Sequence, residues 1–225
     1  MIFTFFPDTC LFKGIAPHDI KTLMDYFDSE EQEYKKGDII FKAGTSTPKI
    51  GIIEKGTANV VVNHPWGTSS VFGQLKDGDV FGGAYDTISA SRLVCDTVAA
   101  ENCKVMFFDM NKMLTITDSS PKDHIVVMRN LVQIASETCL GLAERMIHTA
   151  PNSLRHRIMS YLADLAMKNG SNKFKVPFGR QQMADYLNVN RVAMCGELSK
   201  MQKDGLIKFH KFDFEIFFGN RRPRT

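Results

Sequence analysis

The hydrophobic pattern of this chain changes its period once, near residue 120, and that change restricts the folds open to it. Between about residues 13 and 108, short apolar runs such as Ile39–Phe41 and Val105–Phe108 alternate with turns that contain glycine. Turns at intervals of roughly 8 to 12 residues predict an all-β sandwich or barrel of the jelly-roll kind. A short amphipathic helix is expected to precede the strands, opened by Pro17. Its apolar face would consist of Ile20, Leu23, Met24 and Phe27.

A long helix is expected from Pro121 to about His148. Apolar residues recur there in alternating steps of three and four, which is the narrow seam of a coiled coil rather than the wider stripe of a helix packed on its own domain. At about 1.5 Å per residue, some 28 residues would span roughly 40 Å. The seam predicts a parallel homodimer held by Ile125, Met128, Val132, Ala135, Cys139, Leu142 and Met146.

A break at residues 149–153, which contains Pro151 and the good helix cap Ser153, separates the long helix from a third region. Helical spacing then runs from Leu154 to Ala166, from Arg180 to Leu187 and from Val192 to Asp204. Residues 206–217 alternate between apolar and polar types, as a small β-hairpin does. The predicted fold is α+β with three parts: a jelly-roll β-barrel in residues 1–120, a dimerisation helix and hinge in residues 121–150, and a winged helix-turn-helix in residues 151–225.

Charge is distributed unevenly along the chain. Residues 151–225 carry 14 Lys+Arg against 6 Asp+Glu, whereas residues 1–150 carry 14 against 19. A basic segment joined to an acidic one suggests a polyanion-binding domain attached to a domain with a different partner. The composition, 44% hydrophobic and 24% charged, is that of a soluble globular protein. The five scattered cysteines, the lack of a leader-like start and the lack of an uncharged apolar window predict a cytoplasmic protein with reduced thiols and no membrane span.

Two short helices joined by residues 188–190 have the architecture of a helix-turn-helix, which places its second helix in the major groove of DNA. Asn188 tolerates the left-handed backbone of the turn, and Asn190 is a good cap for the second helix. Arg191 can pair bidentately with guanine, and Val192 can contact a thymine methyl group. The faces expected to be buried carry Met183, Ala184, Leu187, Met194, Leu198 and Met201. The residues predicted to contact double-stranded DNA are Arg180, Gln181, Asn190, Arg191, Val192, Cys195, Gly196, Ser199 and His210.

From about residue 13 to residue 218 the chain resembles the Crp-Fnr superfamily of bacterial transcription regulators. The resemblance rests on Tyr34-Lys35-Lys36-Gly37-Asp38, Ala43-Gly44, Ile53-Glu54-Lys55-Gly56, Gly78-Asp79-Val80-Phe81-Gly82 and the ungapped stretch from Arg180-Gln181-Gln182-Met183-Ala184 to Leu206-Ile207. It implies a cyclic-nucleotide-binding-like β-roll and a surface for RNA polymerase. It also implies that Arg191 takes the place of the family's base-reading arginine, and that His210 takes the place of a wing residue touching phosphate.

Two positions depart from the family members that read TGTGA-type half-sites. Those members carry a glutamate after the base-reading arginine and a second arginine four residues further on, where this chain has Val192 and Gly196. One base contact is worth roughly 1 to 3 kcal/mol of discrimination, so a different operator is expected.

The cyclic-nucleotide branch of the family carries a phosphate-binding cassette in the roll, with Gly-Glu after a Phe-Gly turn and Arg-Ser-Ala about ten residues later. This chain has Phe81-Gly82-Gly83-Ala84 and then Arg92-Leu93-Val94, so the carboxylate that would accept from the ribose hydroxyl is missing. We therefore expect an effector other than cyclic AMP in the roll, of unknown identity. A cyclic-nucleotide response through an atypical cassette stays open as the alternative. The candidate effector residues are Phe81, Gly82, Gly83, Ala84, Arg92 and Leu93.

Other sensor and enzyme classes find little support. An iron-sulfur sensor needs clustered N-terminal cysteines, and only Cys10 is N-terminal. A haem sensor would have to use His64 or Cys95, and thiol sensing would fall to Cys95 or Cys103. A cupin-like metal enzyme fused to a winged helix, the alternative from a different class, needs two or three histidines, and the roll offers only His64. No cofactor or metal site is evident, and we expect a regulator rather than an enzyme.

Overall fold

The computed structural model describes residues 9–82 and 92–217. In chain order its elements are α1 (Pro17–Tyr26), β1 (Glu30–Tyr34), β2 (Ile39–Phe41), β3 (Lys49–Lys55), β4 (Ala58–Asn63), β5 (Ser69–Leu75), β6 (Val80–Gly82), β7 (Asp96–Ala99), β8 (Cys103–Asp109), α2 (Met110–Leu114), α3 (His124–Thr149), α4 (Leu154–Asn169), β9 (Lys173–Lys175), α5 (Arg180–Tyr186), α6 (Arg191–Lys203), β10 (Ile207–His210) and β11 (Asp213–Ile216). The chain divides into two compact units, Met1–Ser136 and Glu137–Thr225, and the division falls within α3.

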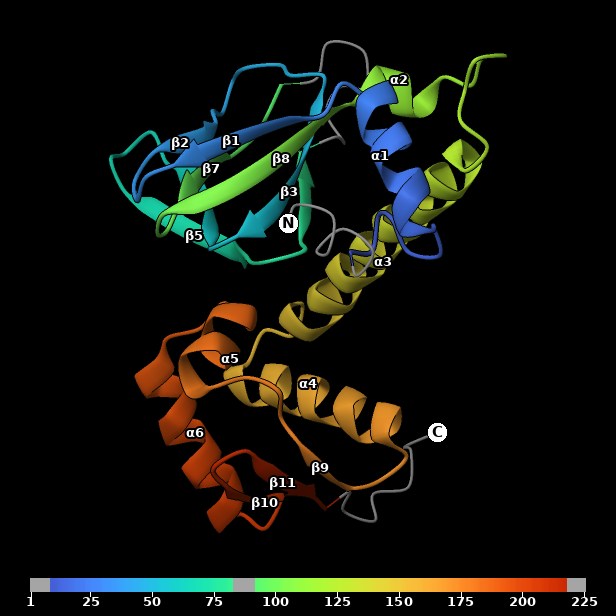
Figure 1. The fold of residues 1–225 in the computed structure, drawn as a ribbon. Helices are drawn as coiled ribbons and strands as arrows, with labels where there is room; N and C mark the ends of the chain where they lie inside the picture. Colours follow the sequence, from blue (N-terminus) through green and yellow to red (C-terminus); the bar gives the residue numbers. More distant parts are fainter. Residues whose placement is uncertain (1–8, 83–91, 218–225) are drawn as a thin grey trace. The chain divides into compact units, whose positions relative to one another are not determined.

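The roll consists of two antiparallel four-stranded sheets, with strand orders β1-β8-β3-β6 and β2-β7-β4-β5 (Figure 1). The jelly-roll fold is confirmed, in the form of two facing sheets rather than a closed barrel. Among the described strands the edges of the two sheets do not pair with each other, so the sheets face one another as a sandwich does. The unit is stabilised by side chains packed between the sheets and by helices packed on them, rather than by closure of a barrel.

Strand β8 shows how the roll is packed on both sides. Val105 and Phe107 point into a core between the two sheets, whereas Met106 and Phe108 point into a second core under the helices. All four side chains are buried, which explains why this strand reads as a continuous apolar run instead of an alternating one. The second core also contains the predicted face of α1, with Ile20, Leu23, Met24 and Phe27 buried, and the N-terminal part of α3.

Helix α3 confirms the long helix predicted after Pro121, and its two halves are packed differently. In the first half, Val127 and Asn130 are buried, and the Asn130 amide donates to the carbonyl oxygens of Leu11 and Lys13 at 2.9 Å each. The predicted seam lies on another face. Six of its seven residues are exposed and Met128 is half-buried. One face of α3 therefore packs on the roll, and a separate apolar face is left exposed by the described part of the chain.

Helix α3 is also the one helix among the described residues with the length and apolar composition of a membrane span, although the sequence reading predicted none. This is weak evidence, because length and composition do not distinguish a membrane span from an amphipathic helix that pairs with another helix. Only 11% of the relevant window is buried inside the structure.

The second unit contains α4, α5, α6 and a three-stranded sheet of order β10-β11-β9 (Figure 1). Ser153 caps α4 by accepting from the His156 amide, as expected, and Gly170 ends the helix in the left-handed conformation. The predicted wing hairpin is present as β10 and β11, and the structure adds β9, a strand that the sequence reading missed. Its three residues, Lys173–Lys175, are too few for a period-two pattern to show.

Candidate nucleic-acid interface

The turn between α5 and α6 has the geometry that its residues predict. Asn188 adopts a left-handed backbone with φ of 52°. The Asn190 side-chain oxygen accepts hydrogen bonds from the amides of Val192 and Ala193 at 2.9 and 3.1 Å, which caps α6. Ala184 is fully buried where the two helices approach each other. The local sequence therefore gives the turn between α5 and α6 its conformation.

Apolar side chains hold both helices against the core of the second unit. The predicted buried faces are confirmed, and each of their members is 0% exposed: Met183, Ala184, Leu187, Met194, Leu198 and Met201. Because these side chains are locked by packing, the opposite face of α6 is presented by a rigid backbone.

The outer face of α6 carries five of the residues predicted to contact DNA. Arg191, Gly196 and Ser199 are exposed, Val192 is 79% exposed, and Cys195 is half-buried. The Ser199 hydroxyl donates to the Cys195 carbonyl at 3.1 Å, so it is directed along the helix. The Arg191 guanidinium and the Val192 methyl groups thus lie at the N-terminal end of α6, the end that contacts base edges in a helix-turn-helix.

Arg180 contacts the wing. Its guanidinium lies 5.2 Å from the ring centre of Phe209 and 5.1 Å from that of Phe214, and it donates to the Lys211 carbonyl at 2.8 Å. Burial lowers the pKa of this guanidinium. The structure thus gives Arg180 a second task, since it joins the start of α5 to the wing through two aromatic faces and one carbonyl.

The remaining residues predicted to contact DNA differ in availability. The Gln181 side-chain amide donates to Asp185 at 2.8 Å, and the Asn190 oxygen is committed to the cap. His210 is exposed at the end of β10, beside the wing turn, where Lys211 has a positive φ of 53°. Of these three residues, His210 has the side chain most open to an approaching phosphate.

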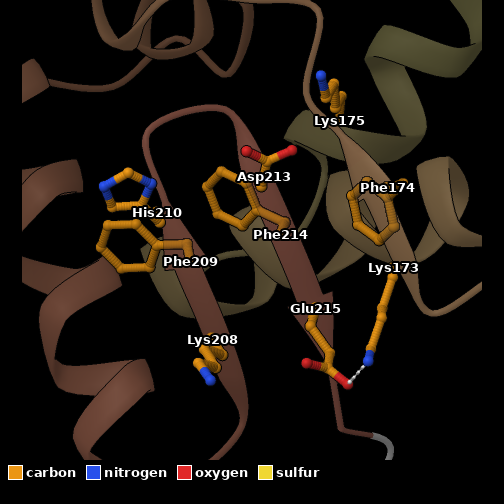
Figure 2. A pocket seen from close by; sticks show the side chains of 9 residues that line it. All are labelled: Lys173, Phe174, Lys175, Lys208, Phe209, His210, Asp213, Phe214 and Glu215. Carbon is orange, nitrogen blue, oxygen red and sulfur yellow. Dashed lines mark ion pairs between the residues drawn. The ribbon is translucent and has the colours of Figure 1, made fainter.

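The outer face of the wing sheet forms a groove of about 490 Å³ (Figure 2). Strand register aligns two rows across it, one with Glu215 between Lys208 and Lys173 and one with Asp213 between His210 and Lys175. Lys173 and Glu215 form an ion pair of 3.5 Å. Because each row has a carboxylate at its centre, the groove is a mixed-charge surface, and the α6 face is the better candidate for nucleic acid.

The predicted effector end of the roll is only partly described. Phe81 and Gly82 lie in β6, whereas Gly83 and Ala84 lie outside the described residues. Gly82 has φ of +86°, and a Cβ added there would approach the Phe41 ring to 2.5 Å, so this glycine is required for close packing. Arg92 is exposed and donates to the Gly44 carbonyl at 3.3 Å, and Leu93 is buried in the core between the sheets.

Metal and thiol chemistry gain no support from the described part of the chain. It contains no group of three or more His, Cys, Asp or Glu side chains placed to hold a metal ion. His64 stacks on Trp66 with ring centres 4.6 Å apart, in the connection between β4 and β5. Burial raises the pKa of the Cys103 thiol, which disfavours the reactive thiolate.

The sequence reading missed Arg145 and His148, two residues of α3 that contact α5. Arg145 donates to backbone carbonyls of Tyr186 and Asp185, and the His148 ring pairs with the Tyr186 hydroxyl. Both residues lie on another face of the helix than the apolar seam. Their one sequence signal is polar and basic character close to the end of a helix.

Comparison with known families matches both units. The cyclic nucleotide-binding domain model matches residues 31–120, and the Crp-like helix-turn-helix domain model matches residues 156–216. Sequence comparison with curated proteins gave no significant match.

Solved structures of low sequence identity share the fold. The global regulator CLP of Xanthomonas campestris, described as responsive to c-di-GMP, is 15% identical with a TM-score of 0.59, over 90% of this chain and 99% of CLP. The catabolite activator protein of Thermus thermophilus is 18% identical with a TM-score of 0.51, over 93% of this chain and 94% of the other. A CooA variant from Carboxydothermus hydrogenoformans is 17% identical with a TM-score of 0.56, over 84% of each chain.

A β-roll of the cyclic-nucleotide-binding type, a long helix and a helix-turn-helix with a wing together define a DNA-binding transcription regulator. The two domain models jointly cover about two thirds of the chain, in the order typical of one family. The chain belongs to the Crp-Fnr family of transcription regulators. The family is one of regulators rather than enzymes.

Proposed function

We propose that this protein is a cytoplasmic homodimer that binds a specific operator through α6 and responds to a small molecule in the roll. The observation that carries the proposal is the outer face of α6, where Arg191 and Val192 are exposed on a helix fixed by a fully buried opposite face. In functional terms, residues 1–120 form the sensor, residues 121–150 the dimerisation helix and hinge, and residues 151–225 the DNA-binding domain. An RNA polymerase contact is part of the same proposal, on the basis of family membership alone.

In this proposal Arg191 reads guanine, Val192 contacts a thymine methyl group, and His210 contacts phosphate from the wing. The proposed operator differs from a TGTGA-type half-site, because Val192 and Gly196 stand where readers of that sequence carry a glutamate and an arginine. The exposure of Val192 supports an apolar base contact at that position.

The test of the α6 surface is Arg191→Ala on an operator selected from random duplexes. We expect a loss of about 1 to 3 kcal/mol at the operator and a relaxed preference at one base pair, because a bidentate base contact is removed. The matched control is Lys200→Ala, which removes one exposed charge from the same helix more than two turns after Arg191. Fluorescence polarisation on matched and mismatched duplexes measures both variants. An equal loss on every sequence would reduce Arg191 to a phosphate contact.

The proposed dimer rests on the open seam of α3. Val132, Leu142 and Met146 are 65%, 57% and 71% exposed, and they follow a heptad spacing on a face that residues 9–82 and 92–217 do not cover. Cys139 is exposed on the same seam, so a parallel dimer brings the two Cys139 thiols to the same level of the coiled coil.

Oxidation with diamide therefore tests both the dimer and its direction. We expect diamide to accept the two hydrogens of the paired thiols and a disulfide to link the two chains through Cys139. Cys139→Ser should abolish the linked species on a non-reducing gel, while Cys10→Ser, a change of another exposed thiol, should keep it. A dimer in sedimentation that forms no link through Cys139 would indicate another arrangement.

For the effector, we propose a small molecule other than cyclic AMP. Support comes from Gly83 and Ala84 at the cassette positions and from the use of Arg92 as a donor to Gly44 within the roll. Isothermal titration with cyclic AMP should show no binding, and DNA affinity should be the same with and without it. Strict dependence of DNA binding on cyclic AMP would favour the alternative of an atypical cassette.

A further inference from the structure

The end of α3 is bonded directly to the end of α5. Arg145 donates from Nε to the Tyr186 carbonyl and from Nη2 to the Asp185 carbonyl, both at 3.0 Å. Its guanidinium also lies 5.8 Å from the ring centre of Tyr186. All of these contacts lie within the second compact unit.

The chemistry of this contact suits a helix C-terminus. The last carbonyls of an α-helix lack partners within the helix and carry partial negative charge, so a cation that donates two hydrogen bonds stabilises them. The planar guanidinium reaches two carbonyls at once, and a lysine ammonium lacks that rigid fork. Arg145 therefore fixes the direction of α5 relative to α3, in addition to adding a charge.

His148 reinforces the same contact one turn further along α3. Its ring is 3% exposed, and Nδ1 lies 2.8 Å from the Tyr186 hydroxyl oxygen. The ring also meets Tyr161 of α4 edge-on, with centres 5.6 Å apart. Tyr186 is thus contacted from α3 at both its backbone carbonyl and its side chain.

We propose that Arg145, supported by His148 and Tyr186, is a positioning site that fixes the helix-turn-helix to the end of the dimerisation helix. Because the turn at Asn188 and Asn190 already sets the angle between α5 and α6, holding the end of α5 sets the direction of α6 as well. In a dimer this direction determines the distance between the two reading helices. Arg145 would therefore select the spacing of half-sites without touching DNA. This inference rests on the proposed dimeric DNA binding.

The experiment uses the full chain and compares one half-site with pairs of half-sites at a series of spacings. Wild type should prefer one spacing. Arg145→Ala should lower that preference by about tenfold, within the usual range of coupling between sites, and leave affinity for the single half-site unchanged. Arg145→Lys should behave like Arg145→Ala, because charge without the fork does not fix the direction of α5. The lysine variant also keeps the test informative if the alanine variant folds poorly.

The matched control is Arg129→Ala, which removes an exposed arginine from the first half of α3 and should keep the full spacing preference. Three results would overturn the inference. The first is an equal loss of affinity on single and paired half-sites, which would indicate a role in stability alone. The second is a spacing preference that Arg145→Ala retains, and the third is the same loss of spacing preference in Arg129→Ala.

Hydrogen exchange separates failure of this inference from failure of the proposed function. The amides at the end of α5 should exchange faster in Arg145→Ala than in wild type whether or not DNA is bound. Faster exchange in Arg145→Ala, combined with no DNA binding by the wild-type protein, would overturn the proposed function, and the selection of half-site spacing would fall with it. Unchanged exchange would overturn the positioning role alone.

Discussion

The α6 surface and the β6 end of the roll both carry a family motif, but they differ in what their side chains are free to do. On α6, Arg191 and Val192 extend outward from a backbone held by fully buried residues. At the end of the roll, Arg92 donates to Gly44, and Gly82 packs closely against Phe41. A motif residue is available to a partner only where the fold itself does not use it.

This difference also shows how far a resemblance extends. The helix-turn-helix retains a side chain of the right type at the base-reading position, and the roll has lost the carboxylate of its cassette. Binding of DNA by α6 is therefore the better supported of the two proposed activities. Substitutions at one surface should alter its activity and leave the other activity unchanged.

The largest expected effect is on the stability of the core that holds α6. Leu198→Ala should lower the free energy of unfolding of the second unit by about 2 to 5 kcal/mol, because Leu198 is fully buried and its loss leaves a cavity. Hydrogen exchange followed separately in the two units should show the loss in Glu137–Thr225 and none in the roll. Val192→Ala, at an exposed site on the same helix, should change stability little, and a similar loss there would show that α6 is not held as described.

The corresponding change in the roll is Gly82→Ala. We expect a loss of about 1 to 3 kcal/mol in the first unit, because the added Cβ combines a positive φ with contacts of 2.5 Å to Phe41 and 3.0 Å to the Lys49 carbonyl. Gly73→Ala is the control, since a Cβ at Gly73 meets nothing within 4 Å. Equal losses of unfolding free energy for both variants in chemical denaturation would contradict the close packing of Gly82 against Phe41.

The units should also differ in their response to acid, through His148. Burial lowers the pKa of His148 below its usual value of 6.5, so the unfolded chain binds this proton more readily than the folded one. Stability of the second unit should therefore be full above about pH 6.5 and fall as the pH drops toward the lowered pKa of the folded state. The titratable and charged groups around the ring are Asp164, Lys168, Glu144, Tyr161 and Tyr186.

Denaturation at a series of pH values, compared with His148→Gln, measures that contribution. Glutamine keeps a neutral polar side chain at this site, so the variant should lose the part of the acid sensitivity that belongs to His148. An unchanged pH profile would assign the sensitivity to other groups.

The smallest expected effect is that of Arg92→Ala. Arg92 is exposed and makes one hydrogen bond of 3.3 Å, so stability should change by no more than about 0.5 kcal/mol. DNA affinity should not change, in contrast to Arg191→Ala. A loss of effector response in Arg92→Ala would show that this arginine is part of the binding site and would weaken the contrast between the two surfaces.

Much of the molecule was predictable from local patterns. The cap at Asn190, the left-handed Asn188 and the buried faces of α5 and α6 follow from short-range rules, and the structure confirms each of them. The roles of the outer α6 residues stay predictions, because free side chains show their function only with a partner.

Contacts between distant segments were not predictable. Strand β9 is recognised by its pairing with β11, which lies some 40 residues later in the chain. Arg180 is the expected residue type for phosphate, but its neighbours Phe209 and Phe214 are brought to it by the wing. Closure of the roll depends on whether sheet edges meet, and no local pattern encodes that distance.

The sequence by itself determined the order of the elements, the ends of the main helices and the face of α6 that is left outward, because capping, turn chemistry and hydrophobic period act over a few residues. Only the tertiary structure decided that the edges of the two described sheets do not pair with each other, that Gly82 packs closely against Phe41, and that Arg145 and His148 of α3 hold the end of α5. These outcomes depend on packing and on hydrogen bonds between residues tens of positions apart, which no short stretch of the chain specifies.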